Sequence, residues 1–197
     1  MIFCWAVLIF TSGINIYILL AIFIAGASLL AYLIIYVPKF DYIQGRIFSF
    51  FNRETGTHNF QSDKAIESIT SGGFFGKGIG EGVLKNRVPE AHTDYIISVI
   101  SEEFGVVAIM LILLLFLILI YMVFKKISFE TNDKVKLILI GSISLILMQA
   151  TIHVGVNIRL FPTTGMTLPF LSYGGSSIIS TSILAGIILN LTKRKIT

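Results

Sequence analysis

The chain has 197 residues, of which 55% are hydrophobic and only 13% are charged, with a formal net charge of +4. Because a soluble domain carries roughly 25% charged residues, this composition argues against a soluble globular protein. The basic residues are spread over several segments without a dense run, which argues against nucleic-acid binding. The single cysteine, Cys4, has no partner for an internal disulfide.

Four apolar segments are long enough to cross a bilayer, since a helix needs about 20 residues to span roughly 30 Å of hydrocarbon. They cover residues 14–37, 104–124, 137–157 and 174–192. Residues 1–12 are too short, and we expect the second half of a span there, or else a re-entrant or interfacial segment. The sequence predicts an all-α integral membrane protein, a polytopic helical bundle with four complete spans, one partial N-terminal span and a large loop over residues 38–103.

The distribution of charges predicts the orientation in the membrane. Lysines concentrate after residue 124 and again in the tail after residue 192, and the positive-inside rule assigns both places to the cytoplasm. Two spans separate these places, so the loop over 38–103 is expected on the outer face. Nine of the eleven acidic residues lie in that loop: Asp41, Glu54, Asp63, Glu67, Glu81, Glu90, Asp94, Glu102 and Glu103.

The outer loop is far longer than a connector needs, and its many Phe and Ile residues argue against disorder. Aromatic and aliphatic residues interrupted by polar ones over 42–51 predict an interfacial helix lying on the membrane. Ala65, Ile66 and Ile69 recur with helical spacing among polar neighbours, which predicts a second amphipathic helix.

A glycine run, Ser-Gly-Gly-Phe-Phe-Gly-Lys-Gly-Ile-Gly-Glu-Gly, occupies residues 71–82. It is not a Walker A loop, because only three residues separate Gly72 from Gly76 and Gly78 replaces the Ser or Thr that would hold magnesium. It is not a dinucleotide fingerprint either, because no buried strand precedes it. Two interpretations stay open: a flexible turn that folds the outer loop back on the membrane, or a diphosphate cradle of backbone N–H groups and Lys77.

Asp94 stands between a helix-breaking residue, Pro89, and an apolar lead-in to the next span. The pattern places a helix start at Thr93 or Asp94. One interpretation is that Asp94 only caps that helix, with Glu102 and Glu103 solvated. The other is that Asp94 is a general base in a polar hollow at the membrane surface.

Residues 157–177 hold two prolines, three glycines and many hydroxyl side chains, so they cannot form an uninterrupted lipid-facing helix. Such irregular backbone at membrane depth requires protein or water to satisfy it. His153, inside a predicted span, is either a hydrogen-bonded structural residue or part of a cavity lining. Three histidines and one cysteine, widely spaced, give no zinc pattern.

Four blocks of sequence, in this order, resemble the SEDS family of bacterial cell-wall synthases, whose members include FtsW, RodA and SpoVE. The blocks are residues 71–78, residues 89–94, Glu102-Glu103-x-Gly105, and residues 162–177. The sequence Ala-His-Thr-Asp at 91–94 is closer to the FtsW division branch than to the RodA branch, where Gln is common at the position of Ala91. The chain matches only the later, C-terminal portion of the family, so we expect a truncated chain, a fragment or the product of a split gene.

The resemblance implies polymerisation of lipid II, a disaccharide-pentapeptide on undecaprenyl pyrophosphate, into glycan strands outside the bacterial cytoplasmic membrane. Asp94 matches the family's proposed catalytic aspartate. One carboxylate suffices, because the attacking sugar hydroxyl needs a base whereas a diphosphate leaves without a second acid. The remaining candidates are Lys77, Lys85, Arg87 and Arg159 to balance the diphosphate, Glu90 and His92 to shape the site, and Thr164, Ser172 and Tyr173 to line the cavity.

A divalent cation could assist the basic residues, since fixed positive charge helps most where charge develops on the leaving group. The implied partners are a class B penicillin-binding transpeptidase, other divisome membrane proteins and the lipid bilayer. Two alternative functions stay open: a lipid II flippase, for which His153, Asn157 and the broken helix around Pro169 would line a path, and an inactive interaction partner. Asp94→Asn separates an enzyme from a flippase, which needs no base.

Overall fold

The structure is a computed structural model that describes residues 2–41, 43–45, 47, 57–83 and 91–193. All regular secondary structure in these residues is helical. The elements are α1 (Ile2–Thr11), α2 (Ile16–Tyr36), the short 3-10 helix η1 (Pro38–Phe40), α4 (Thr57–Gly72), α5 (Ile96–Phe129), α6 (Asp133–Asn157) and α7 (Gly175–Thr192).

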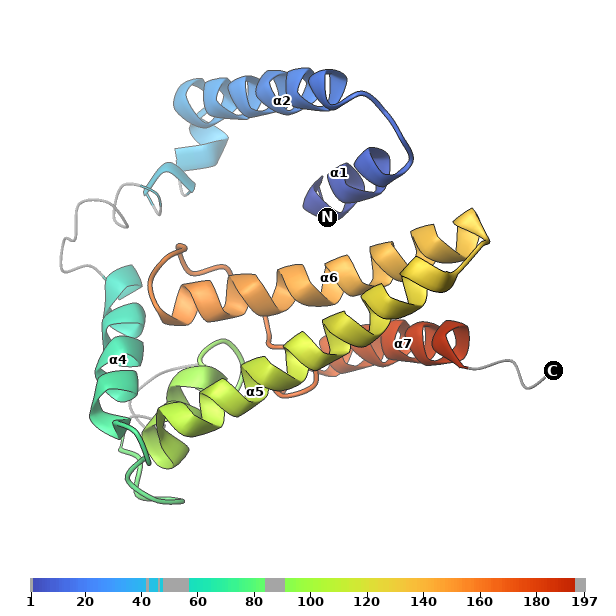
Figure 1. Cartoon of the computed structure of the whole chain (residues 1–197). Helices are drawn as coiled ribbons and strands as arrows, with labels where there is room; N and C mark the ends of the chain where they lie inside the picture. The colour runs from blue at the N-terminus through green and yellow to red at the C-terminus, as the bar shows by residue number, and fades with distance from the viewer. Residues whose placement is uncertain (1, 42, 46, 48–56, 84–90, 194–197) are drawn as a thin grey trace.

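Helices α5, α6 and α7 pack side by side as the body of the molecule, and α4 crosses one end of that body against α5 and α6 (Figure 1). Helix α1 packs against α6 on the opposite side from α5, and α2 forms the outermost layer. Helix α2 contains no buried residue, so its apolar surface faces away from the other described helices.

Four of these helices are long and apolar enough to cross a membrane: α2, α5, α6 and α7. Together with the helical architecture they confirm the predicted class, a polytopic all-α membrane protein. The predicted second amphipathic helix corresponds to α4. Of the predicted interfacial helix over 42–51, residues 43–45 and 47 are helical, whereas Tyr42, Arg46, Phe48, Phe50 and Phe51 lie outside the described residues.

The packed core runs along α6. At one end Leu139, Ile143 and Ile146 of α6 pack with Val123 of α5 and Ile188 of α7. Further along, Ala150 packs with Ile97 of α5 and with Leu168 of the connection between α6 and α7. Through Leu168, this second group holds the irregular connection against the helices. Irregular backbone at membrane depth needs such cover, because lipid cannot satisfy its polar groups.

Helix α5 contains a break that the sequence analysis did not predict. The helix begins at Ile96, ahead of the predicted span over 104–124, and is interrupted at Gly105, whose φ of 77° and ψ of −179° are not helical. These angles are open only to glycine. Residues 96–104 therefore form a separate helical segment of about two and a half turns.

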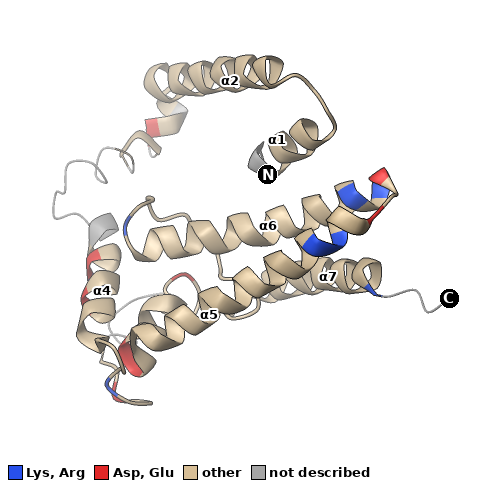
Figure 2. Ribbon diagram, viewed as in Figure 1, with Lys and Arg blue, Asp and Glu red and all other residues tan. Residues whose placement is uncertain are grey.

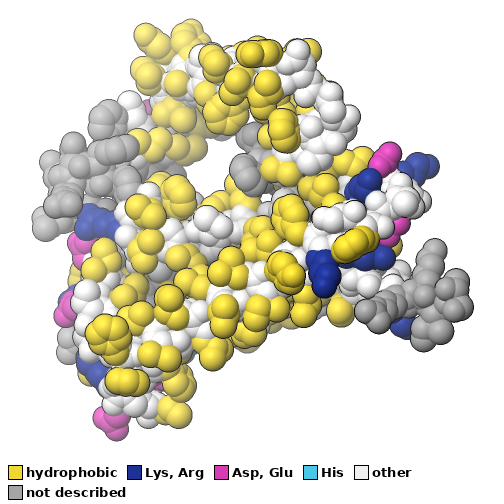
Figure 3. Space-filling model, in the orientation of Figure 1, with side chains coloured by type: hydrophobic (Ala, Val, Ile, Leu, Met, Phe, Trp, Pro, Cys, Tyr) yellow, Lys and Arg dark blue, Asp and Glu magenta, His cyan; other side chains and the backbone are white. Residues whose placement is uncertain are grey.

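Charged residues lie at the two ends of the bundle (Figure 2). Lysines gather around the connection from α5 to α6, and acidic residues gather around α4 and the start of α5. Between the two ends the surface is dominated by hydrophobic side chains (Figure 3).

Candidate functional site

The Asp94 turn, residues 91–95, joins the undescribed segment 84–90 to α5. Its two ends are anchored in a small core, where Ala91 and Tyr95 are buried against Ala65 of α4 and Val156 of α6. The N-cap of α5 is Tyr95, one residue later than the sequence pattern indicated, and its side chain makes no capping hydrogen bond. Asp94 therefore lies in the turn itself and not at the helix cap.

The connection between α6 and α7 binds the main chain of this turn. The N–H of Tyr173 donates to the carbonyl oxygen of His92 at 3.0 Å. The hydroxyl of Ser172, a buried residue, donates to the carbonyl oxygen of Thr93 at 2.7 Å. The same hydroxyl accepts the N–H of Leu168 at 2.8 Å, so Ser172 links two parts of the irregular backbone.

Helix α6 binds the turn from the other side. The side-chain amide of Asn157 donates to the carbonyl oxygen of Asp94 at 3.0 Å, and its Oδ1 accepts the hydroxyl of Ser98 at 2.7 Å. His153 Nε2 lies 3.4 Å from the carbonyl oxygen of Thr93. Both Asn157 and His153 are fully buried. Three successive carbonyls of the turn, from His92 to Asp94, are thus held by neighbouring elements.

Asn157 and His153 belong to a polar stripe on α6, defined as Gln149, His153 and Asn157, which are spaced four residues apart on one helix face. Gln149 Nε2 donates to the carbonyl oxygen of Thr167 at 2.9 Å and to Ser177 Oγ at 3.0 Å. All three side chains of the stripe therefore bind irregular backbone or hydroxyls beside α6. The sequence hypothesis identified His153 but missed Gln149 and the role of Asn157, although their regular spacing inside a span was visible.

The carboxylate of Asp94 faces Gly165 in the connection between α6 and α7. A Cβ atom placed on Gly165 would lie 3.6 Å from Asp94 Oδ2, and Gly165 has a φ of 68°. Glycine at 165 thus permits the positive φ of this turn, and a Cβ there would stand in van der Waals contact with the carboxylate. Thr164, the preceding residue, is exposed. A polar pocket of about 300 Å³ adjoins Gly165, lined by Gln149, Met166, Thr167, Ser176, Ser177 and Ser180.

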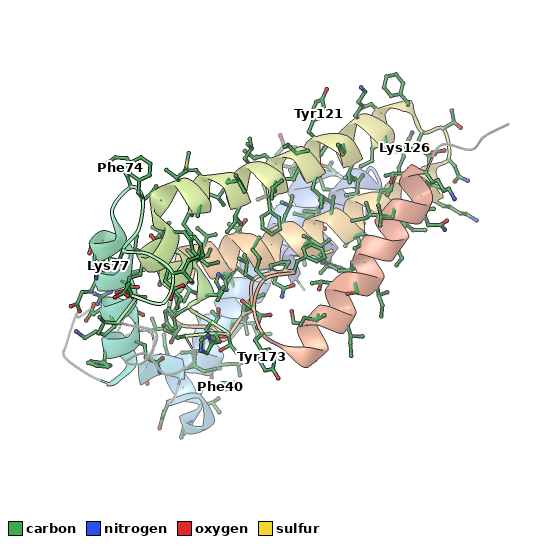
Figure 4. All side chains as sticks on the ribbon, turned by 90° about the horizontal axis from the view of Figure 1, so that it is seen from below. Phe40, Phe74, Lys77, Tyr121, Lys126 and Tyr173 are labelled. Carbon is green, nitrogen blue, oxygen red and sulfur yellow. The ribbon has the colours of Figure 1, made fainter. Side chains whose placement is uncertain are left out.

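Apart from Thr164, which precedes Gly165, the predicted site residues separate into three groups. Asp94, His92, Ser172 and Tyr173 come together at the turn, and Tyr173 projects from the connection between α6 and α7 (Figure 4). Arg159 forms an ion pair with Asp63 of α4, and Lys77 forms one with Glu102. Lys85, Arg87 and Glu90 lie outside the described residues.

The glycine run packs into the break in α5. The N–H groups of Val106 and Val107, which follow the break, donate to the carbonyl oxygens of Gly73 and Phe74 at 3.0 and 3.3 Å. A Cβ on Gly105 would collide with the carbonyl group of Phe74. The run therefore caps the apolar part of α5 and satisfies N–H groups that would otherwise face the bilayer.

N–H groups of the run also donate to carbonyl oxygens of α5. The N–H of Lys77 donates to the carbonyl oxygen of Glu102 at 2.8 Å, and the N–H of Gly78 donates to that of Glu103 at 3.1 Å. These donors are engaged within the protein and are not offered to a diphosphate. The structure favours the interpretation as a turn over the cradle, and the turn is fixed by hydrogen bonds rather than flexible.

Glu102 is the buried anchor of this region, contrary to its expected place on a solvated surface. Only 1% of Glu102 is exposed. Its carboxylate accepts from Lys77 Nζ at 3.2 Å, from the N–H of Val83 at 3.1 Å and from the hydroxyl of Ser68 at 3.3 Å. Burial of a carboxylate is tolerable because three donors surround it. Within the described residues, no group of three or more His, Cys, Asp or Glu side chains is arranged to hold a metal ion.

Comparisons with known proteins identify the family of the chain. The family model of FtsW/RodA/SpoVE cell cycle proteins matches residues 1–196. A probable peptidoglycan glycosyltransferase FtsW of Enterococcus hirae is 36% identical over 183 residues, covering 88% of this chain and 46% of that protein. The protein of the same name from Caulobacter vibrioides (strain NA1000 / CB15N) is 38% identical over 158 residues, covering 79% of this chain and 40% of that protein.

A solved chain is similar in structure, with a TM-score of 0.74 and 28% identity. It comes from work on the structural coordination of polymerization and crosslinking by a peptidoglycan synthase complex, and the match covers 94% of this chain and 51% of that one. The chain spans less than half the length of the two curated relatives above. Since the family model covers almost every residue, the chain belongs to the FtsW/RodA/SpoVE family of cell cycle proteins.

Proposed function

We propose that this chain forms the catalytic region of a peptidoglycan glycosyltransferase that polymerises lipid II into glycan strands during cell division. The observation that carries the proposal is the Asp94 turn, whose carbonyls are bound by Tyr173, Ser172 and Asn157. Oδ2 of its carboxylate lies toward Gly165. The names of the similar proteins, probable peptidoglycan glycosyltransferases, support the same chemistry.

In this mechanism the Asp94 carboxylate accepts the proton of a sugar hydroxyl on one lipid II or glycan chain. The oxygen forms a bond to the anomeric carbon of the other sugar while the bond from that carbon to the diphosphate breaks. Undecaprenyl diphosphate leaves with the electron pair, and the anomeric configuration inverts in a single displacement. A fixed turn favours this step, because a general base must be held within hydrogen-bond reach of the proton it removes.

The cations divide into structural and catalytic roles in this proposal. Lys77 and Arg159 are engaged with Glu102 and Asp63, so we assign them to holding the outer loop. Lys85 and Arg87 are left to balance the diphosphate, with Glu90, His92, Thr164 and Tyr173 around the substrate. A divalent cation bound to the diphosphate is compatible with this scheme and would balance the charge that develops on the leaving group.

The orientation of the chain is part of the proposal. The lysine-rich connection between α5 and α6 is assigned to the cytoplasm by the positive-inside rule, which puts the Asp94 turn and the C-terminus on opposite sides of the membrane (Figure 2). Substrate sugars would then be joined outside the cytoplasmic membrane. A class B penicillin-binding transpeptidase and other divisome membrane proteins are the proposed partners, in line with the peptidoglycan synthase complex to which the structural neighbour belongs.

The polar stripe of α6 weighs against the flippase alternative. A flippase needs polar groups that a headgroup can contact along its path through the membrane. Gln149, His153 and Asn157 instead bind backbone and hydroxyl groups of the protein itself. The stripe therefore supports a fixed site at one end of the bundle.

The decisive test compares Asp94→Asn with Glu81→Gln, an exposed carboxylate of the same outer loop, in the purified protein with its partner transpeptidase. We expect Asp94→Asn to lower the rate of polymer formation from lipid II by about 100-fold or more, the usual contribution of a general base. Glu81→Gln should keep the parent rate. Undiminished polymerisation by Asp94→Asn would refute the assignment, and topology reporters that place the turn in the cytoplasm would refute the orientation.

A further inference from the structure

The tip of the glycine run carries two exposed aromatic side chains. Phe74 and Phe75 are 76% and 85% exposed, in a turn whose main chain is fixed on α5 by hydrogen bonds. Residues 71–80 carry one charge, Lys77, and its ammonium group is turned toward the buried Glu102. The tip is thus an apolar projection of fixed position, which distinguishes it from a scattered exposed side chain.

The hydrogen bonds locate this tip relative to the membrane. The carbonyl oxygens of Gly73 and Phe74 bind the N–H groups of Val106 and Val107. The uncharged stretch of α5, residues 104–124, matches the roughly 30 Å thickness of the hydrocarbon. Val106 and Val107 therefore lie at one edge of the hydrocarbon, and the tip lies at the same level.

The tip is also continuous with the apolar surface of α5. Figure 4 shows Phe74 on the outer edge of α5, the edge from which Tyr121 projects farther along the helix, whereas Lys77 lies on the side of α4. Val107, Met110 and Leu114 are exposed along α5, so the helix surface next to the tip has no cover from the described residues. The tip extends this uncovered apolar surface of α5.

We propose that Phe74 and Phe75 insert into the bilayer at the edge of its hydrocarbon and anchor the outer loop to the membrane beside α5. Aromatic rings are favoured at this depth, where an apolar body meets a polar boundary. The glycines on both sides let the backbone make the turn, and the hydrogen bonds to α5 fix its depth. The inference does not depend on the role of Asp94, because it concerns the position of the loop and not its chemistry.

Depth-dependent quenching of tryptophan fluorescence tests this anchor. The only tryptophan, Trp5, is replaced in a Trp5→Phe background, and Phe75→Trp is introduced as the probe. The matched control is Phe129→Trp, a phenylalanine of 77% exposure that lies beyond Lys125 and Lys126, outside the uncharged stretch. Each variant is reconstituted in phosphatidylethanolamine and phosphatidylglycerol vesicles whose acyl chains carry bromine at shallow or deep positions, and the helical circular dichroism signal verifies the fold.

We expect shallow bromines to quench the Phe75→Trp probe more than deep bromines do, and aqueous iodide to quench it less than it quenches Phe129→Trp. A Leu114→Trp probe near the middle of the span should be quenched most by deep bromines. Quenching of Phe75→Trp by iodide but by neither brominated lipid would overturn the proposal, and so would protection from all of these quenchers, which is the result expected if protein rather than lipid covers the tip. Because no activity is measured, this failure is distinguishable from failure of the glycosyltransferase proposal.

Discussion

The Asp94 turn and the glycine run lie at the same end of the bundle, and neighbouring helices hold the main chain of both. They differ in which groups hold them. In the Asp94 turn, three successive carbonyls accept hydrogen bonds from Tyr173, Ser172 and Asn157, and Asp94 Oδ2 lies toward Gly165. In the glycine run, the main chain pairs with the main chain of α5, and Lys77 forms an ion pair with buried Glu102. The first arrangement fixes the backbone around Asp94, and the second covers the end of the apolar part of α5.

The largest effect is expected for Gly105→Ala, which disrupts the packing of the glycine run against α5. The φ of 77° is strained for any other residue, and the new methyl group would collide with the carbonyl of Phe74. We expect a loss of about 3 kcal/mol in the free energy of unfolding, from the sum of backbone strain and steric overlap. Thermal denaturation followed by circular dichroism measures it. Gly26→Ala in α2, where a Cβ meets open space, is the control, and equal melting curves for the two variants would contradict the account of the break.

Asn157→Ala tests how the Asp94 turn is held in place. It leaves the carbonyl of Asp94 and the hydroxyl of Ser98 without their partner in a buried place, which costs about 2 kcal/mol. Because the lost contact positions the turn, we expect polymerisation to fall more than stability alone explains, with the decrease in kcat rather than in the amount of folded protein. Asn190→Ala, at an exposed asparagine of α7, should change neither. A variant with normal kcat would show that Asn157 does not position the turn.

The smallest expected effect is that of Glu102→Gln. The amide keeps an oxygen at the position that accepts from Val83, its NH2 group takes the position that faces the hydroxyl of Ser68, and the charge that pairs with Lys77 is lost. Lys77 is 38% exposed and can be solvated by water, so we expect a loss of only about 1 kcal/mol in unfolding free energy. A double-mutant cycle with Lys77→Gln measures the coupling. Strictly additive losses would mean that the ion pair contributes nothing, and that main-chain bonds alone hold the run.

Much of the architecture could be predicted from composition and spacing. The four apolar helices, the amphipathic helix α4 and the irregular connection after Asn157 follow from local patterns that a single segment carries. Asp94 could be proposed as the catalytic carboxylate because it precedes an apolar helix and matches a family motif. Its place in the turn rather than at the helix cap depends on Tyr95, which is drawn into a core with residues of α4 and α6.

The remaining features depend on contacts between segments far apart in the chain. Hydropathy averages over residues 96–124 and does not reveal the break at Gly105, because glycine angles depend on what packs against them. The burial of Glu102 was missed for the same reason, since its donors come from α4 and from the glycine run. The assignment of Lys77 and Arg159 to a diphosphate considered charge alone, whereas the structure gives each of them an acidic partner.

The unequal lengths of α6 and α7 have a consequence for the shape of the membrane surface. Helix α6 has 25 residues and α7 has 18, a difference of seven residues or about 10 Å of helix. Gln149 precedes Asn157 by eight residues, or about 12 Å along α6, and it binds Thr167 of the connection and Ser177 of α7. Because Ser177 lies in the first turn of α7, that helix begins about 12 Å below the level of Asn157. The protein surface therefore has a step at this end of the bundle. The hydroxyl groups of the pocket beside Gly165 lie at its lower level, and the Asp94 turn lies at its upper level.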